Sequence, residues 1–270
     1  MTELIKLVVD GSCAEIILNK PARRNALCQK MWKALPQMIG EAVRDEQVSV
    51  IIIHGGNTGA FAAGADISEF AEIYETQEKA TAASAAMADA VAAVENCEKP
   101  IVAAIEGACI GGGVSIAAAC DLRFAEHGSK FAVTPGKLGL LYSPADTRRL
   151  IAVVGHAAAK DLLLSGRLIT FEEAQAIRLI NHPTPEGGAL RAAKTWAEQV
   201  GHLSQASVRA TKEMFRGLEN GWQDHTPEAI DLFLNALISR DFEEGYRAFL
   251  EKRAPQFPGN GPSKPGGRSG

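Results

Sequence analysis

The chain has 270 residues, of which 46% are hydrophobic and 22% charged, and its 28 basic and 32 acidic residues give a formal net charge of −4. This composition can bury a full core and argues against a disordered or fibrous chain, while the lack of a long run of like charges argues against nucleic acid as a partner. The longest uncharged stretch, Gly107–Cys120, is too short and too rich in glycine to span a bilayer.

The beginning of the chain and the cysteine pattern bear on the compartment. The first ten residues mix charged with apolar side chains, so they lack the separate basic and apolar regions of a signal peptide. The five cysteines form no C-x-x-C pair, and the six histidines show no spacing typical of metal ligands. We therefore expect a cytoplasmic protein with no metal and no membrane partner.

Short apolar runs rich in β-branched residues predict strands in the first half of the chain. The first two runs flank Asp10-Gly11-Ser12 and predict a hairpin, and the later ones suit a sheet covered on both faces. The runs are Ile5–Val9, Ala14–Leu18, Val48–Ile53 and Ile101–Ile105.

Helical signals alternate with these runs and then replace them. Apolar residues at helical spacing from Leu27 to Ala42 predict a helix, which Pro36 should kink or restart. The alternation of strands and helices up to about Phe131 predicts an α/β fold with right-handed crossovers, and strand signals stop beyond roughly Pro144. Helix starts are then expected at Thr170 with Glu173, Thr226 before Pro227, and Asp241 with Glu244.

This pattern suggests three segments. We expect an α/β core over residues 1–200 and a helical region over residues 201–257. Residues 258–270 are rich in Pro and Gly and hold almost nothing apolar, so we expect a disordered tail there.

A strand, a tight turn and a helix start follow one another within Ile101–Asp121, IVAAIEGACIGGGVSIAAACD. Gly111, Gly112 and Gly113 let the main chain approach a ligand without a Cβ in the way, and the first amides of the helix have no partner within it. These N–H groups and the positive end of the helix dipole favour an oxygen that carries negative charge.

The segment FAAGADISEF offers a second turn of this kind. Small residues lead into Asp66, which has the signature of a helix N-cap with Glu69 three residues later. The amide of Ala65 lies at that turn. If it meets the amide of Gly112, the two donors make an oxyanion hole that stabilises a developing anion by several kcal/mol.

Five segments, in order and with similar intervals, resemble the crotonase, or enoyl-CoA hydratase/isomerase, superfamily. The likeness extends over about Ile5 to Phe257 and implies a crotonase (ClpP/crotonase-like) fold built on a ββα-repeat core, with a C-terminal helical trimerisation region. It also implies a homotrimer or a dimer of trimers, and a role in fatty acid metabolism. The segments are NKPARRNAL, FAAGADI, IEGACIGGG…ACD, LITFEEAQAIRLIN and DFEEGYRAFLEKRAPQF.

The resemblance also assigns roles to residues. It implies an acyl-CoA substrate whose thioester oxygen receives the amides of Ala65 and Gly112, with no cofactor beyond the CoA moiety itself. Phe249 and Lys252 match positions that cap the nucleotide, often from a neighbouring subunit, and the charge of the lysine suits a phosphate. The remaining positions implied to bind CoA are Arg24, Ala26, Ala63, Gly64, Asp66 and Ile67.

The chain departs from the hydratases of this family at the reacting end. Two glutamates handle water and proton there, and their places are held by Ser115 and Gly136, which supply neither a base nor an acid near neutral pH. The pattern T-P-x-x-L-G-x-x-Y, from Thr134 to Tyr142, resembles the methylmalonyl-CoA decarboxylase branch. That branch has an acidic residue where this chain has Ser115, and the dihydroxynaphthoyl-CoA synthases have an aspartate where it has Tyr142.

Decarboxylation fits a site without carboxylates, because loss of CO₂ from a malonyl-type CoA thioester forms the enolate without a base. In this interpretation Ala65 and Gly112 hold the enolate, Thr134 and Ser115 orient the carboxylate, and Tyr142 or its bound water returns the proton. We therefore predict a lyase acting on acyl-CoA.

Alternatives remain open at this point. The chain could hydrate or isomerise an enoyl-CoA with acids that the sequence does not place, for instance Glu72, Glu75 or Asp146, or it could be an acyl-CoA binder without catalysis, or a CoA thioesterase that forms no covalent intermediate. Tyr142 could be a buried aromatic residue, and Ser115 could bond to a helix carbonyl.

Overall fold

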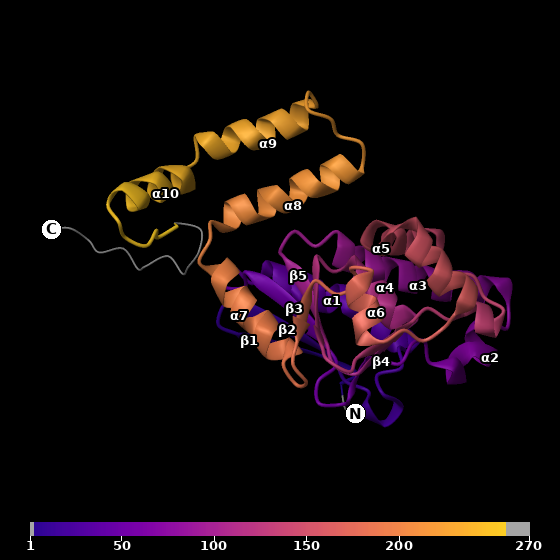
Figure 1. The fold of residues 1–270 in the computed structure, drawn as a ribbon. Helices are drawn as coiled ribbons and strands as arrows, with labels where there is room; N and C mark the ends of the chain where they lie inside the picture. Colours follow the sequence, from indigo (N-terminus) through magenta and orange to yellow (C-terminus); the bar gives the residue numbers. More distant parts are fainter. Residues whose placement is uncertain (1–2, 258–270) are drawn as a thin grey trace.

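The computed structural model describes residues 3–257, which form an α/β core with helices projecting from it (Figure 1). Within these residues the larger sheet has the order β1-β2-β3-β5-β7-β9 and the smaller one the order β4-β6-β8. The strands of the larger sheet are β1 (Ile5–Asp10), β2 (Cys13–Leu18), β3 (Val50–His54), β5 (Ile101–Ile105), β7 (Leu122–Glu126) and β9 (His182–Thr184). Those of the smaller sheet are β4 (Ala60–Ala62), β6 (Ala108–Ile110) and β8 (Lys130–Ala132).

Strands β1 and β2 form the predicted antiparallel hairpin, and every other neighbouring pair in the two sheets, within residues 3–257, is parallel. Helices connect and cover the strands. They are α1 (Gln29–Arg44), α2 (Phe70–Ile73), α3 (Gln77–Glu95), α4 (Gly112–Ala119), α5 (Pro144–Ser165), α6 (Phe171–Ala176), α7 (Ala189–Gly201), α8 (Gln205–Glu219), α9 (Pro227–Leu237) and α10 (Arg240–Leu250).

The larger sheet is buried on both faces, as its apolar strands predict. Alternate residues of β3 point to opposite sides: Ile51 and Ile53 belong to the main core with α1, α3 and α4, whereas Val50 and Ile52 pack against α7. The helix α7 presents a stripe of alanines to that second face, which lets it lie close to the sheet. The stripe is Ala189, Ala193 and Ala197.

Helix α1 is continuous through Pro36, so the proline does not restart it, and the apolar face before and after the proline is buried. Two other sequence expectations are wrong in detail. A strand does follow Pro144: β9 pairs with β7 at the edge of the sheet, where a strand can contain Pro183 without losing a bond to a second neighbour. Ser239 rather than Asp241 caps α10, since the Asp241 carboxylate accepts a hydrogen bond from Ser204 Oγ at 2.5 Å.

Other helix starts agree with the sequence. Thr170 and Glu173 form the predicted capping box at α6, and Pro227 is the first residue of α9 after its N-cap Thr226. The division at residue 200 stays a prediction, although α7 ends at Gly201, and the expected tail, 258–270, lies outside the described residues.

Asn25 connects the segment before α1 to the loop between β3 and β4 by hydrogen bonds. Its side chain is fully buried, and its amide nitrogen lies 2.9 Å from the carbonyl oxygens of Gly55 and Ala60. Its side-chain oxygen accepts a hydrogen bond from the Lys20 backbone at 2.9 Å. The side chain therefore holds two segments, far apart in the sequence, that both continue toward the candidate site.

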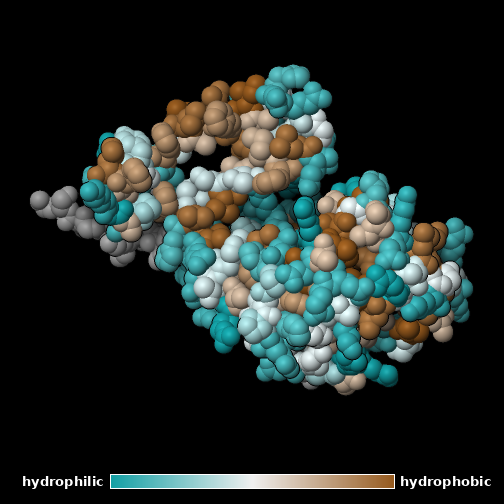
Figure 2. Space-filling model, viewed as in Figure 1, coloured by the Kyte–Doolittle hydropathy of each residue, from teal (hydrophilic) through white to brown (hydrophobic). Residues whose placement is uncertain are grey.

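The C-terminal helices α8, α9 and α10 extend away from the core (Figure 1). Apolar side chains are exposed along them, and Figure 2 shows this hydrophobic surface on the projecting part. Phe233 is 60% exposed, Ile238 84% and Phe249 83%. Exposed apolar side chains gathered on neighbouring helices are typical of a surface that contacts another molecule.

We expect Asn25→Ala to lower the free energy of unfolding by about 2–3 kcal/mol, because it leaves buried backbone groups without partners. Chemical denaturation measures the loss. The matched control is Arg23→Ala in the same segment, whose exposed side chain should be worth less than about 0.5 kcal/mol. Equal effects of the two substitutions would contradict the role given to Asn25.

Candidate active site

Three turns lie next to one another at the carboxyl ends of the strands of the smaller sheet. Strands β4, β6 and β8 are parallel neighbours, so the segments that follow them, 63–66, 111–112 and 133–134, leave the sheet on the same side. The sheet thereby brings three predicted site residues, Ala65, Gly112 and Thr134, to neighbouring turns.

The first two turns are in direct contact. A Cβ placed on Gly111 would lie 3.7 Å from the Cα of Gly64. Both glycines have positive φ, +98° at Gly64 and +51° at Gly111, which is a conformation that favours glycine. The Gly111 amide also donates to the Ala132 carbonyl at 2.8 Å, which joins the second turn to the end of β8.

The two predicted amide donors make no hydrogen bond in the part of the chain that the structure describes. Leu27 donates to Gly64 O at 2.8 Å and accepts from Asp66 N at 3.0 Å, so it bonds the residues on either side of Ala65 and the Ala65 N–H points away from it. Gly112 is the first residue of α4, where an amide has no partner within the helix. Among residues 3–257, neither Ala65 N nor Gly112 N donates a hydrogen bond.

Packing also requires these glycines. A Cβ on Gly112 would lie 2.9 Å from Cζ2 of Trp32, and one on Gly113 would lie 2.9 Å from the Cβ of Ala62. Both contacts are closer than side chains normally allow. The structural and the functional interpretations of the triple glycine are therefore compatible.

Ser115 and Tyr142 form a hydroxyl pair one helical turn beyond these amides. Their oxygens are 2.8 Å apart, and Ser115 is 3% exposed. The serine thus bonds the tyrosine, not a helix carbonyl. Burial raises the pKa of Tyr142, and the Asp146 carboxylate raises it further, so the hydroxyl stays protonated at neutral pH. The pair can donate and accept hydrogen bonds but cannot act as a strong base.

The position of the second hydratase glutamate is open to solvent. Gly136 lies in a short 3-10 helix, Pro135–Leu138, and a Cβ built there would meet no atom within 4 Å. A larger side chain would fit, so the missing carboxylate is a difference in chemistry that packing does not impose. Thr134 precedes this helix as its half-buried N-cap residue and makes no side-chain cap.

Two of the acids that the sequence left unplaced are engaged in other interactions. Asp146 accepts from Ser143 Oγ at 2.7 Å and pairs with Arg149 at 3.1 Å, and Glu75 pairs with Lys79 at 2.5 Å on the surface. Glu72 is exposed on α2.

The segments implied to bind CoA lie together on one side of the first turn. The Ala63 amide donates to Arg24 O at 3.0 Å, which places Arg24 and Ala26 beside Ala63 and Gly64. Ile67, 59% exposed, follows directly.

Asp66 caps the short helix Ile67–Glu69 by accepting from Ser68 N at 3.1 Å. Hydrogen bonds from Lys20 and Ser68 lower the pKa of Asp66 to about 2. The Glu69 carboxylate accepts a hydrogen bond from Gln29 N at 2.8 Å, and Asp66 N donates to Leu27 O, so Glu69 holds the start of α1 and does not complete a capping box with Asp66.

Phe249 and Lys252 are not brought to these segments within a single chain. They lie at and after the end of α10, which projects away from the core in Figure 1.

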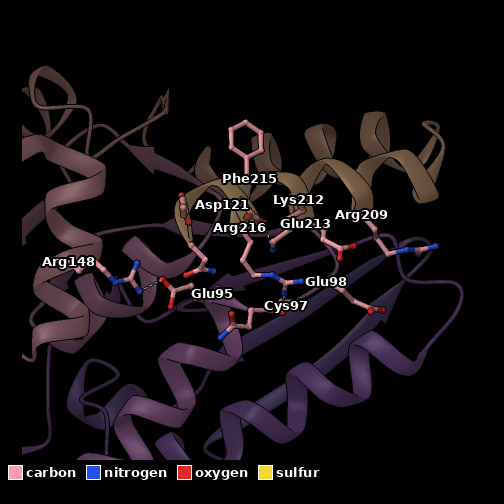
Figure 3. Close-up of a pocket in the computed structure, with 13 residues that line it drawn as sticks. Glu95, Cys97, Glu98, Asp121, Arg148, Arg209, Lys212, Glu213, Phe215 and Arg216 are labelled. Atoms are coloured by element: carbon pink, nitrogen blue, oxygen red, sulfur yellow. Dashed lines mark hydrogen bonds and ion pairs between the residues drawn. The ribbon is translucent and has the colours of Figure 1, made fainter. Parts of the chain in front are cut away.

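A polar cavity of about 370 Å³ lies elsewhere, between the end of α3, the end of α4 and α8 (Figure 3). Charged side chains of both signs line it, among them Glu95, Asp121, Arg148 and Lys212. Lys212 pairs with Asp121 at 2.7 Å there. Sequence reasoning did not single out this cavity.

No helix within residues 3–257 has the length and apolar character needed to cross a membrane. Nor do those residues hold a group of three or more His, Cys, Asp or Glu side chains suited to a metal ion.

Comparison with known proteins agrees with this architecture. The family model described as enoyl-CoA hydratase/isomerase matches residues 9–260. A crystal structure of an enoyl-CoA hydratase/isomerase family protein from Hyphomonas neptunium superposes with a TM-score of 0.93 at 56% identity, covering 95% of this chain and 98% of that one.

Curated relatives of different activity match over nearly their whole length. The 2,3-dehydroadipyl-CoA hydratase of Escherichia coli is 32% identical, covering 90% of this chain and 94% of the relative. The Delta(3,5)-Delta(2,4)-dienoyl-CoA isomerase of Arabidopsis thaliana is 30% identical, with 94% and 96% covered. The chain therefore belongs to the enoyl-CoA hydratase/isomerase, or crotonase, family.

Proposed function

We propose that the protein acts on an acyl-CoA thioester and stabilises the enolate of that thioester with the amides of Ala65 and Gly112. The observation that carries this proposal is the contact between two glycine turns in which the amides of Ala65 and Gly112 donate no hydrogen bond within residues 3–257. Negative charge moves onto the thioester oxygen whenever a bond at the α-carbon breaks or forms heterolytically, and fixed amides stabilise it without reorganising.

The names of the relatives support hydration or double-bond isomerisation of an enoyl-CoA as the reaction, more than they support decarboxylation. Both reactions move a proton at the α-carbon or beyond it, and both need a group that accepts one. Ser115 and Tyr142 are the polar side chains expected at the reacting end. In this interpretation they orient water or donate a proton, and a carboxylate outside the pair, for instance the exposed Glu72, accepts the proton.

Decarboxylation of a malonyl-type CoA thioester is a second candidate, which the hydroxyl pair favours. Loss of CO₂ leaves the electron pair on the α-carbon and forms the enolate directly, so no base is required. A glutamate at position 115 or 136 would repel the departing carboxylate, whereas the hydroxyls of Ser115 and Thr134 can orient it. The protonated Tyr142 hydroxyl, or water bound to it, then returns a proton to the α-carbon.

Incubation with crotonyl-CoA, malonyl-CoA and methylmalonyl-CoA, followed by mass spectrometry, separates the candidates. A gain of one water supports hydration, and a loss of CO₂ supports decarboxylation. Positional isomerisation leaves the mass unchanged and is read by chromatography with a 3-enoyl-CoA. Binding of CoA without turnover of any of these substrates would indicate a non-catalytic binder and overturn the proposed reaction.

Tyr142→Phe should reduce kcat by about 100-fold, because it removes the hydroxyl paired with Ser115, and should leave the affinity for CoA unchanged. Steady-state kinetics and calorimetry measure the two quantities. Tyr74→Phe, which removes the same atom from an exposed tyrosine outside the proposed interface, is the control. Wild-type turnover in the Tyr142 variant would remove this residue from the mechanism.

We also propose that copies of the chain assemble as a homotrimer or a dimer of trimers through the C-terminal helices. The exposed apolar side chains of α9 and α10 support this, since burial between copies would remove them from water. In such an assembly Phe249 and Lys252 can reach the CoA of a neighbouring copy. These two residues would then complete a site that one chain leaves open.

Light scattering should give the mass of three or six chains, and Ile238→Lys, which places a charge on this surface, should shift the mass toward that of one chain. Lys33→Glu, an exposed change on α1, should leave the mass unaltered. A wild-type protein that is monomeric at micromolar concentration would contradict the proposed assembly.

A further inference from the structure

The start of α5 is fixed by a network that begins beside Tyr142. The next residue, Ser143, is the N-cap: its Oγ accepts from Asp146 N at 3.0 Å and donates to Asp146 Oδ2 at 2.7 Å. Its carbonyl accepts from Thr147 N at 2.8 Å. The chain at Tyr142 therefore enters α5 in a direction that the side chain of Asp146 helps to set.

Arg149 connects this cap to a different helix. Its guanidinium pairs with Asp146 Oδ1 at 3.1 Å through Nη1 and with Glu95 Oε2 at 2.6 Å through Nη2. Glu95 is the last residue of α3, and its other oxygen pairs with Arg148 at 2.8 Å (Figure 3). Arg149 is only 7% exposed, whereas the side chain of Arg148 is 59% exposed.

The elements so joined carry both members of the hydroxyl pair. Helix α3 packs against α4, which holds Ser115, and α4 packs against α5, which Tyr142 precedes. A link between α3 and the start of α5 therefore restrains the second hydroxyl relative to the first. Without that link, the 2.8 Å contact would depend on the tyrosine ring packing alone.

We infer that Arg149 is a positioning residue for Tyr142: by joining Asp146 to Glu95, it holds the tyrosine hydroxyl against Ser115 at the reacting end of the site. The expected effect of Arg149 on turnover rests on the proposed function, whereas its effect on the position of Tyr142 does not. Arg149 touches no reacting atom, so it acts only through the tyrosine that it places.

The charges around the two partners are consistent with this role. Burial favours the neutral carboxyl of Glu95, but the hydrogen bonds from Arg149 and Arg148 outweigh it and lower its pKa, so Glu95 is ionised at neutral pH. The groups that face Tyr142 are Ser115 of α4, Cys109 of β6, and Asp146 and Arg149 of α5.

The pKa of Tyr142 indicates whether its hydroxyl remains in its buried position beside Ser115. Burial is the main cause of the raised pKa of Tyr142, and the Arg149 charge opposes it only weakly. If the hydroxyl leaves its place and meets water, its pKa falls toward the ordinary value of about 10. This change is opposite in direction to the one that loss of the arginine charge alone would cause.

The experiment compares Arg149→Gln with Arg148→Gln, which removes a charge from the same glutamate without touching Asp146. Tyrosinate absorbance is followed through alkaline pH; the protein has three tyrosines, and Tyr142→Phe identifies the signal. Arg149→Gln should show about one more tyrosine ionising near pH 10 than wild type. On the substrate that wild type turns over, its kcat should fall about 10- to 100-fold with KM within about twofold.

Arg148→Gln should match wild type in both measurements. Arg149→Lys keeps the positive charge but loses the two separate nitrogen donors of the guanidinium, so it should recover only part of kcat. Wild-type kcat and an unchanged tyrosine titration in Arg149→Gln would overturn the inference, as would equal losses in the two glutamine variants. If Arg149→Gln does not fold, Glu95→Gln breaks the same link more gently and is judged by the same two measurements. Should wild type turn over no acyl-CoA, the proposed function fails, while the tyrosine titration still decides the role of Arg149.

Discussion

The structure depends on the close approach of two glycine turns at the end of parallel strands β4 and β6. A side chain on Gly111 would meet the backbone at Gly64, and one on Gly112 would meet the ring of Trp32. Within residues 3–257, the amides of Ala65 and Gly112, which belong to these two turns, donate no hydrogen bond, and we propose that they point at one thioester oxygen. Because these donors are main-chain groups held by a sheet and a helix start, they keep their positions whatever chemistry the neighbouring side chains perform.

The side chains next to the two glycine turns determine which reaction the site can perform. The relatives include a hydratase and an isomerase of the same family, so membership of the family does not choose between reactions. In this chain the buried Ser115 and the half-buried Tyr142 form a hydroxyl pair near the proposed oxyanion hole, and Gly136 leaves open a place where a carboxylate would fit. The charged residues nearest the tyrosine support its position, since Asp146 and Arg149 are bound to each other.

Local sequence signals account for the hairpin, the buried strands, the capping box at Thr170 and both glycine turns, because each depends on residues close together in the chain. What the sequence did not indicate depends on contacts between distant segments. Strand β9 has only three residues and exists because β7 offers an edge. Helix α1 continues through Pro36 because its apolar face is buried in the core, which outweighs the lost bond.

The same holds for the candidate site. The turns at Gly64 and at Gly111 could be located from local sequence, whereas the Ser115 to Tyr142 contact spans 27 positions and the Arg149 to Glu95 pair spans 54. An acidic residue three positions before Arg149 was a weak signal of a pairing on one helix face. The partner on α3 had no such signal, because only the packing of α3, α4 and α5 brings it there.

The polarisation of a bound thioester carbonyl tests the central claim most directly. With an acyl-CoA labelled with ¹³C at the carbonyl, difference infrared spectroscopy reports the strength of that bond on the protein. Two amide donors should lower the carbonyl stretching frequency relative to the free thioester in water. A bound thioester whose carbonyl absorbs at the frequency of the free compound would contradict the oxyanion hole.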